Sequence, residues 1–159
     1  MLLWGVVYLM VEGTSLKRTD KIIEIARSWK GTPYLAQASL KGVGCDCIGL
    51  VRGVFRELYG YEPEERLDYS QDWGDSNGDE SLVRVANKYL KPIPLADKGP
   101  GDVVAIRWKE DRVAKHVMIL TDEGRAIHSY TRAPVTEIYL SRWWEDHTIY
   151  AFKFPEEDI

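Results

Sequence analysis

Cysteine and histidine are scarce in this sequence of 159 residues, which contains two cysteines and three histidines. Cys45 and Cys47 are separated by a single residue, and a disulfide across so short a loop would be strained. This excludes a disulfide-stabilised scaffold, because such scaffolds carry several well-separated cysteine pairs. The two side chains are therefore expected to be thiols, with reactivity or metal binding as the functions open to them.

The sequence also lacks an excess of positive charge and any long apolar run. Lysine and arginine number 21 against 25 aspartates and glutamates, and the net charge of −4 argues against nucleic acid as the partner. No segment reaches the roughly 20 apolar residues that span a bilayer. With 45% hydrophobic and 29% charged residues, the composition is that of a folded domain with a sizeable core.

The first ten residues are uncharged and mostly apolar, yet they do not resemble an export signal. The first basic residue, Lys17, follows this run instead of preceding it, and residues 12–14 form no small-residue cleavage site. We interpret residues 1–18 as an N-terminal extension, either a strand-like segment or an over-long start, with an export signal as the less favoured alternative. Residues 19–159 are expected to form one domain, and the sequence assigns it no cellular location.

Apolar periodicity and turn residues predict helices in the first part of the chain and strands in the second. Helices are expected at residues 19–29, 46–59 and 79–89, and a long acidic loop at residues 61–80. Strands are expected at residues 103–108, 116–120, 125–130, 135–139 and 149–154, with a hairpin turn at residues 121–124. Helices followed by an antiparallel sheet define an α+β fold class.

Cys47 stands at the start of the second predicted helix, which Gly60 is expected to end. Unpaired backbone N–H groups and the helix dipole favour a thiolate in the first helical turn. The same N–H groups donate hydrogen bonds to an oxyanion when the sulfur attacks a carbonyl group. The alternative is a small apolar side chain that packs beneath the helix start, and position alone leaves both interpretations open.

His116 and His128 lie on either side of the predicted hairpin, twelve residues apart. Antiparallel pairing places two such positions on one face of the sheet, where one imidazole can hydrogen-bond the other. A thiol nucleophile needs a base and a group that orients the base, and this pair supplies both. The alternative is that both are ordinary core histidines, whose ring nitrogens have hydrogen-bond partners but no catalytic role. The third histidine, His147, is expected at an exposed strand edge and has no assigned role.

Zinc is a second possibility, since Cys45, Cys47, His116 and His128 offer four nitrogen and sulfur ligands. The C-x-C spacing is tighter than that of the usual zinc-binding cysteine pair, which disfavours this site. No metal or cofactor is therefore expected.

Five short segments follow one another in a specific order. They are Gly31-Thr32-Pro33-Tyr34, Asp46-Cys47-Ile48-Gly49-Leu50-Val51, Pro100-Gly101-Asp102-Val103-Val104, His116-Val117-Met118-Ile119 and Ala126-Ile127-His128-Ser129. They resemble the motifs of the NlpC/p60-type cell-wall cysteine peptidases, a papain-like superfamily of bacterial and phage enzymes. The resemblance extends from about residue 20 to residue 154. It implies a papain-like NlpC-type domain in which N-terminal helices pack on an antiparallel β-sheet.

Within this family, three features resemble a phage-tail or gene-transfer-agent subgroup: Lys41-Gly42-Val43-Gly44-Cys45-Asp46-Cys47, the Trp143-Trp144 pair and Ala151-Phe152-Lys153-Phe154-Pro155. This resemblance implies phage-like tail proteins as partners that deliver the domain to the cell wall. Two residues depart from the family pattern, since Ile48 replaces a small serine and Met118 replaces a glycine. Their bulk is expected to narrow or reshape the substrate groove.

Carried over residue by residue, the resemblance implies Cys47 as the nucleophile, His116 as its base and His128 as the residue that orients the base. Tyr34 and Asp46 are implied in oxyanion or substrate binding. The implied activity is hydrolysis of a peptidoglycan stem peptide through a thioester, at the bond between D-glutamate and a diamino acid. Two alternatives stay open: a non-catalytic tail or wall-peptide-binding component, and an acyltransferase or amidase that acts on another substrate.

Overall fold

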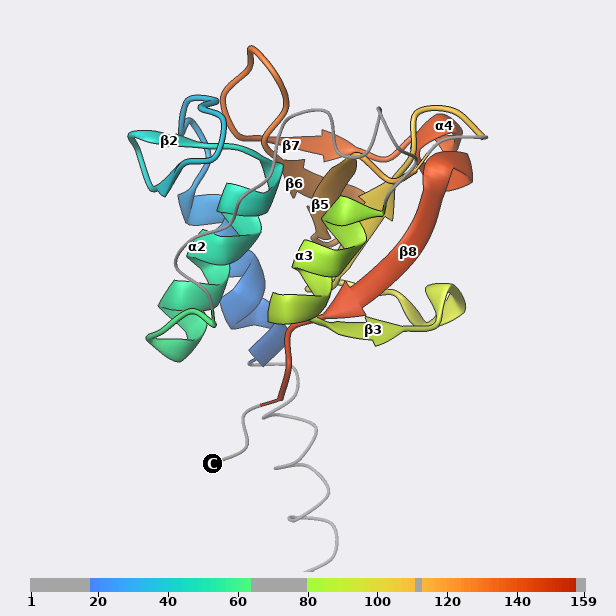
Figure 1. The fold of residues 1–159 in the computed structure, drawn as a ribbon, viewed down its shortest axis with the longest axis horizontal. Helices are drawn as coiled ribbons and strands as arrows, with labels where there is room; N and C mark the ends of the chain where they lie inside the picture. Colours follow the sequence, from blue (N-terminus) through green and yellow to red (C-terminus); the bar gives the residue numbers. More distant parts are fainter. Residues whose placement is uncertain (1–17, 64–79, 111–112, 157–159) are drawn as a thin grey trace, which may run out of the picture.

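The computed structural model describes residues 18–63, 80–110 and 113–156 (Figure 1). Helical backbone occupies residues 18–28. The elements that follow are β1 (Ser39–Leu40), β2 (Gly44–Cys45), α2 (Cys47–Tyr59), α3 (Ser81–Tyr89), β3 (Lys91–Ile93), the 3-10 helix η1 (Leu95–Asp97), β4 (Val103–Ile106), β5 (His116–Leu120), β6 (Arg125–His128), β7 (Thr136–Tyr139), α4 (Arg142–His147) and β8 (Thr148–Lys153). None of the helices in these ranges has the length and apolar character to cross a membrane.

The larger sheet of the described chain is antiparallel, with the strand order β3-β8-β4-β5-β6-β7 (Figure 1). Within this sheet, the neighbouring strands β5 and β6 form a hairpin. Its turn has left-handed backbone at Glu123 (φ 54°) and Gly124 (φ 72°). The hairpin predicted at residues 121–124 is confirmed. Together with the helices, the sheet confirms the α+β fold class.

Helix α2 begins one residue after the predicted start at position 46 and ends at the predicted residue, Tyr59. Asp46 is the N-cap, and its Oδ1 accepts a hydrogen bond from the N–H of Gly49 at 2.7 Å. Gly60 ends the helix in the left-handed conformation, with φ 82°. Residues 47–55 are all buried, so α2 is a central helix of the domain.

The sheet carries a hydrophobic core on each of its faces, because alternate residues of a strand point to opposite sides. The helix-side core joins α2 and α3 to one face, and its strand residues include Val103, Ala105, Val117, Ile119, Ile127 and Phe152. The outer core covers the opposite face with Val104, Ile106, Met118, Leu120, Ala126 and Ala151. Trp108 and Trp144 pack against this outer core. The central strands β4 and β5 are thereby shielded from water on both faces.

Some elements differ from the prediction. The strand β3 and the helix α4 were not predicted; α4 has only six residues, too few for helical periodicity to show. His147 is the last residue of α4, so the predicted strand edge is wrong there, and its ring stacks on Trp143 with centroids 4.0 Å apart. Strands β4 and β6 each end two residues earlier than predicted. Most of the predicted acidic loop, at positions 64–79, lies outside the described residues.

Gly53 of α2 provides a test of how tightly the helix-side core is packed. A Cβ atom at this position would lie 2.0 Å from the ring of Trp29. That ring is 1% exposed and held by a 3.0 Å hydrogen bond from its Nε1 to Glu57, so it has little room to move. We expect Gly53→Ala to lower the free energy of unfolding by about 1–3 kcal/mol, because overpacking outweighs the helix propensity that alanine adds.

Urea unfolding followed by circular dichroism measures this change. Gly99→Ala is the matched control, because a Cβ there meets no atom within 4 Å. Equal stability of the Gly53 variant and the parent would show that the contact between Trp29 and α2 is looser than the structure has it.

Candidate functional site

Cys47 is the first residue of α2, and only 7% of its surface is exposed. Burial raises the pKa of its thiol to about 12, and the neighbouring charge of Asp46 adds to this effect. Backbone N–H groups of Val117, Ile48 and Cys47 itself hydrogen-bond the sulfur and oppose the shift, but they are the weaker influence. The expectation that the helix start ionises this side chain is therefore wrong. At neutral pH the candidate nucleophile is a thiol.

His116 begins β5, His128 ends β6, and their imidazoles meet. Nε2 of His116 lies 2.9 Å from Nδ1 of His128, and the two residues are 3% and 7% exposed. The prediction that both rings share one face within hydrogen-bonding distance is confirmed. Burial lowers the pKa of His116 to about 3, with a further contribution from His128, and lowers that of His128 to about 4. Both rings are neutral at pH 7.

Two contacts hold the start of α2 against the ends of β5 and β6. The N–H of Val117, the residue directly after His116, hydrogen-bonds the sulfur at the start of the helix. The hydroxyl of Ser129, the residue directly after His128, donates to the carbonyl oxygen of Cys45 at 2.9 Å. The segment that carries the thiol is thus tied to the neighbour of each histidine.

Asp46 is buried, and both of its carboxylate oxygens accept backbone hydrogen bonds. Oδ1 accepts from Gly49 and Oδ2 from Gln37, each at 2.7 Å. The carboxylate therefore joins the loop before α2 to the first turn of that helix. An anionic acceptor has no proton to donate to an oxyanion, so these contacts give Asp46 a positioning role. Its implied role in substrate binding stays a prediction.

Tyr34 is half-buried in the loop that leads to β1, and its backbone bridges that of Cys45. Burial raises the pKa of its phenol, while a hydrogen bond with Thr131 opposes the shift. The charges of Asp46 and Cys47 also contribute to the shift, which places the hydroxyl in the neighbourhood of the candidate nucleophile. The phenol stays protonated at neutral pH and able to donate. Its implied role at the oxyanion stays a prediction.

Cys45 differs from its neighbour by being fully enclosed. It lies in β2 with 0% exposure, and burial raises the pKa of its thiol to about 11. Within residues 18–63, 80–110 and 113–156, no three or more His, Cys, Asp or Glu side chains are arranged to hold a metal ion. The zinc interpretation therefore has no ligand set in this part of the chain.

The two residues that depart from the family pattern do not line a groove. Ile48 is 2% exposed in the helix-side core, and Met118 is 0% exposed in the outer core. The expectation that their bulk narrows the substrate groove is wrong. The added volume fills the interior on the two sides of the sheet instead.

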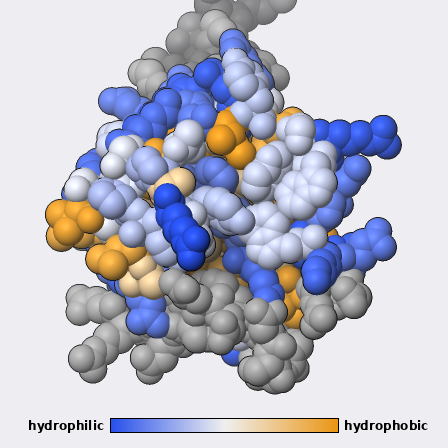
Figure 2. Space-filling view, turned by 90° about the horizontal axis from the view of Figure 1, so that it is seen from above, coloured by the Kyte–Doolittle hydropathy of each residue, from blue (hydrophilic) through white to orange (hydrophobic). Residues whose placement is uncertain are grey.

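Aromatic rings surround the histidine pair, and the sequence patterns did not single out two of them as site residues. Trp108 and Tyr130 lie two residues beyond the ends of β4 and β6 and contact the imidazoles. Their even spacing from Ile106 and His128 was the available signal, because it continues the alternation of each strand. Figure 2 views the molecule from the end where α2 begins, with pale ring-shaped side chains on the side of α4 and apolar ones on the side of β2.

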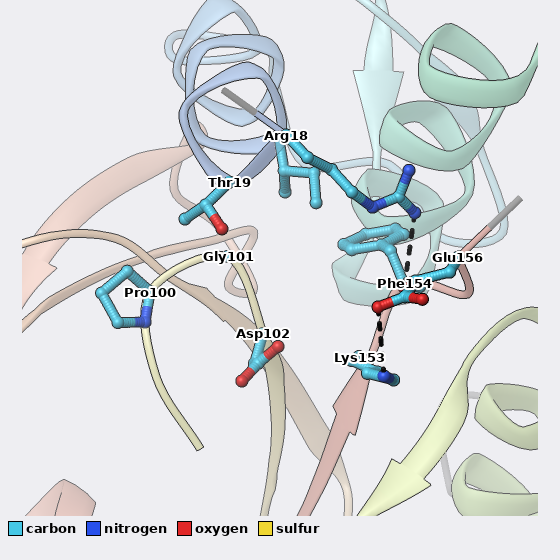
Figure 3. A pocket seen from close by; sticks show the side chains of 9 residues that line it. Arg18, Thr19, Pro100, Gly101, Asp102, Lys153, Phe154 and Glu156 are labelled. Atoms are coloured by element: carbon cyan, nitrogen blue, oxygen red, sulfur yellow. Dashed lines mark hydrogen bonds and ion pairs between the residues drawn. The ribbon is translucent and has the colours of Figure 1, made fainter. Parts of the chain in front are cut away.

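A pocket of about 120 Å³ lies elsewhere, where residues 18–28 begin and β8 ends (Figure 3). Its charged groups are already engaged with one another or with the backbone. Arg18 donates to the carbonyl oxygen of Phe154, Lys153 pairs with Glu156 at 3.8 Å, and Asp102 accepts from the N–H of Gly99. None of the predicted site residues lines this pocket.

A thiol at a helix start and paired imidazoles on an antiparallel sheet define the class of papain-like α+β domains. The sequence model of the NlpC/P60 family matches residues 31–153, and the chain belongs to this family. Gamma-DL-glutamyl hydrolase of Bacillus subtilis (strain 168) is 29% identical over 126 residues, which are 78% of this chain and 26% of that protein. The chain therefore spans about a quarter of the length of this relative.

Solved structures share the fold. The NlpC/p60 domain of the peptidoglycan hydrolase SagA has a TM-score of 0.57 and 20% identity, over 86% of this chain and 98% of that one. A lipoprotein-like NLP/P60 family protein of Staphylococcus aureus has a TM-score of 0.58 and 22% identity, over 89% of this chain and 42% of that one. The peptidoglycan hydrolase RipB of Mycobacterium tuberculosis has a TM-score of 0.55 and 20% identity, over 91% of this chain and 68% of that one. At these identities the likeness establishes the fold.

The buried imidazoles make the stability of the domain sensitive to mild acid. Folding lowers their pKa values from about 6.5 to about 3 and about 4, so the unfolded chain binds more protons between these limits. Stability is therefore complete above pH 6.5 and is lost as pH falls. We expect the free energy of unfolding to decrease by about 1–2 kcal/mol per histidine from pH 6.5 to pH 5.

Urea unfolding at these two pH values measures the effect in the parent and in His128→Asn. The variant removes one titrating ring, so its pH dependence is expected to be about half as steep. Both pH values lie above 4.5 so that the ion pairs of Glu137 stay intact during the measurement. A hydrogen bond from Arg27 is the main cause that lowers the pKa of Glu137 to about 2, so these pairs break only in stronger acid. Identical pH dependence of the two proteins would contradict the assignment to these rings.

Proposed function

We propose that this domain is a cysteine endopeptidase that cleaves peptidoglycan stem peptides, with Cys47 as the nucleophile, His116 as its base and His128 as the residue that orients the base. The observation that carries the proposal is the buried 2.9 Å contact between the two imidazoles. A second support is that the N–H of Val117, the residue after His116, hydrogen-bonds the sulfur of Cys47. Such a set serves proton transfer to and from sulfur.

The contact between the rings determines which tautomer is productive. Nε2 of His116 faces His128, which leaves Nδ1 of His116 for the thiol. His116 accepts the proton of Cys47 only if its Nδ1 carries none, and its own proton then sits on Nε2. In this tautomer Nε2–H of His116 donates to Nδ1 of His128, and His128 keeps its proton on Nε2. The second histidine thus maintains the first in its basic form.

The reaction begins from a neutral thiol and a neutral imidazole, as their pKa values require. As sulfur adds to the peptide carbonyl carbon, the thiol proton moves to Nδ1 of His116. N–H groups around Cys47 and the hydroxyl of Tyr34 stabilise the oxyanion. The imidazolium then protonates the leaving amine, and a thioester remains. Water attacks the thioester while Nδ1 takes its proton, which returns to sulfur as the acid product leaves.

We infer that the scissile bond joins D-glutamate to a diamino acid. The support is the relative named for γ-DL-glutamyl hydrolysis and the peptidoglycan hydrolases that share the fold. The motif segments that carry Cys47, His116 and His128 lie inside the matched range of residues 31–153. Delivery by a phage-like tail is a further part of the proposal, and only the subgroup resemblance in the sequence supports it.

The nucleophile and base are tested together by Cys47→Ala and His116→Ala. Each is expected to lower the rate of stem-peptide cleavage by at least about 1,000-fold, because a thiol without a base, or water at the same site, attacks an amide very slowly. Cleavage of purified muropeptides, followed by chromatography and mass spectrometry, measures the rate and separates hydrolysis from acyl transfer.

Cys45→Ala is the matched control, since it removes the other thiol two residues away. It is expected to retain cleavage, with the fold of every variant checked by circular dichroism. Full activity of the Cys47 variant, or loss of activity in the Cys45 variant alone, would overturn the assignment of the nucleophile.

The orienting role of His128 is tested by two substitutions of different chemistry. Asparagine keeps an acceptor for Nε2–H of His116, so His128→Asn is expected to lower kcat by about tenfold. Leucine leaves that buried donor without a partner and the tautomer unspecified, so His128→Leu is expected to lower kcat by on the order of 100-fold. Steady-state kinetics on a stem peptide compares them, and equal losses would contradict the orienting role.

A further inference from the structure

Trp108 and Trp144 lie against the face of the sheet opposite to α2, and they also contact the candidate catalytic histidines. Trp108 stacks on His116 with ring centroids 5.6 Å apart and planes inclined by 22°. Trp144 meets His128 edge-on at 5.7 Å and also approaches His116 at 6.4 Å. The two imidazoles therefore touch indole rings as well as one another.

The stack continues outward from Trp108 into α4. The ring of Trp143 lies 5.8 Å from that of Trp108 at 25°, and His147 covers Trp143 at 4.0 Å and 18°. Four rings, those of His147, Trp143, Trp108 and His116, thus follow one another with neighbouring planes nearly parallel. Since α4 has six residues and no side-chain cap, these ring contacts contribute to holding it against the sheet.

A hydrogen bond at one nitrogen does not determine the plane of an imidazole. The second side-chain torsion of histidine is broad, so the ring of His116 could rotate about an axis near Nε2 while keeping its contact with His128. Such rotation would swing Nδ1, the atom that serves the thiol. A flat ring stacked on the imidazole removes this freedom, and Trp108 is that ring.

The same contact favours the charged form of the base. During the reaction His116 becomes an imidazolium in a buried site, where no bulk water stabilises the charge. The face of an indole carries negative potential and attracts a cation stacked on it. His128 and Tyr130 are the titratable side chains in ring contact with His116.

We propose that Trp108 is a positioning residue for His116, held in place by the tryptophans of α4, and that it fixes the imidazole plane in which Nδ1 receives the proton of Cys47. This inference rests on the proposed function, because it takes His116 as the base. The competing explanation is that Trp108 only fills the outer core, against which it also packs.

Alkylation of Cys47 by iodoacetamide, with the modified residue identified by mass spectrometry, tests this proposal without relying on peptide turnover. Trp108→Leu keeps an apolar side chain but removes the flat ring, and it is expected to slow alkylation at pH 7 by about tenfold. Trp108→Phe restores a flat ring and is expected to stay within about threefold of the parent. With a stem peptide, the leucine variant is expected to lose kcat while KM changes by less than about twofold.

Two further variants separate positioning from simple packing. Trp29→Phe alters another buried tryptophan, in the helix-side core, and is expected to lower stability without slowing alkylation of the folded protein. Trp143→Leu removes the partly exposed ring that supports Trp108 and is expected to slow alkylation by about two- to fivefold. Because Trp143 is 44% exposed, this variant keeps the test available even if Trp108→Leu does not fold.

The outcomes distinguish this inference from the proposed function. If His116→Ala does not slow alkylation of Cys47, the base itself is misassigned and the positioning role fails with it. If His116→Ala slows alkylation but Trp108→Leu and Trp143→Leu do not, only the positioning role is overturned. Equal losses in Trp108→Leu and Trp108→Phe also overturn it. Normal alkylation behaviour without muropeptide cleavage would refute the proposed substrate and leave the role of Trp108 supported.

Discussion

The hydrogen bond between His116 and His128 is the interaction on which the site depends. It joins two buried imidazoles, and in that setting a lost partner would leave a buried polar nitrogen unsatisfied. The bond exists because β5 and β6 are neighbours in the sheet and the hairpin sets their register, with Ile119 opposite Ile127. A slip of one residue would send the two rings to opposite faces.

Burial also determines the charge state of the site before the reaction begins. It raises the pKa of the Cys47 thiol and lowers the pKa values of both imidazoles, so all three groups are neutral at pH 7. In the proposed mechanism, charge develops only as the sulfur attacks, and groups already oriented toward it contribute most at that moment. The backbone N–H groups at the start of α2 and the indole ring of Trp108 are the groups to which the proposals above give this part.

The site is assembled from both sides of one sheet. Cys47 belongs to the helix-side core, whereas His116 lies in the same alternation as Met118 and Leu120 of the outer core. At the beginning of β5 the N–H of Val117, the residue after His116, hydrogen-bonds the sulfur of Cys47. Packing errors in either core would therefore displace one partner relative to the other.

Local sequence determined the parts that short-range chemistry controls. The cap at Asp46 and the glycine at position 60 set the ends of α2, and an even separation across a tight turn set the shared face of the two histidines. Only the tertiary structure decided the rest: the neutral state of Cys47, the burial of Ile48 and Met118, and the rings stacked on His116. These features arise from desolvation and from contacts between residues distant along the chain, and neither periodicity nor motif spacing encodes them.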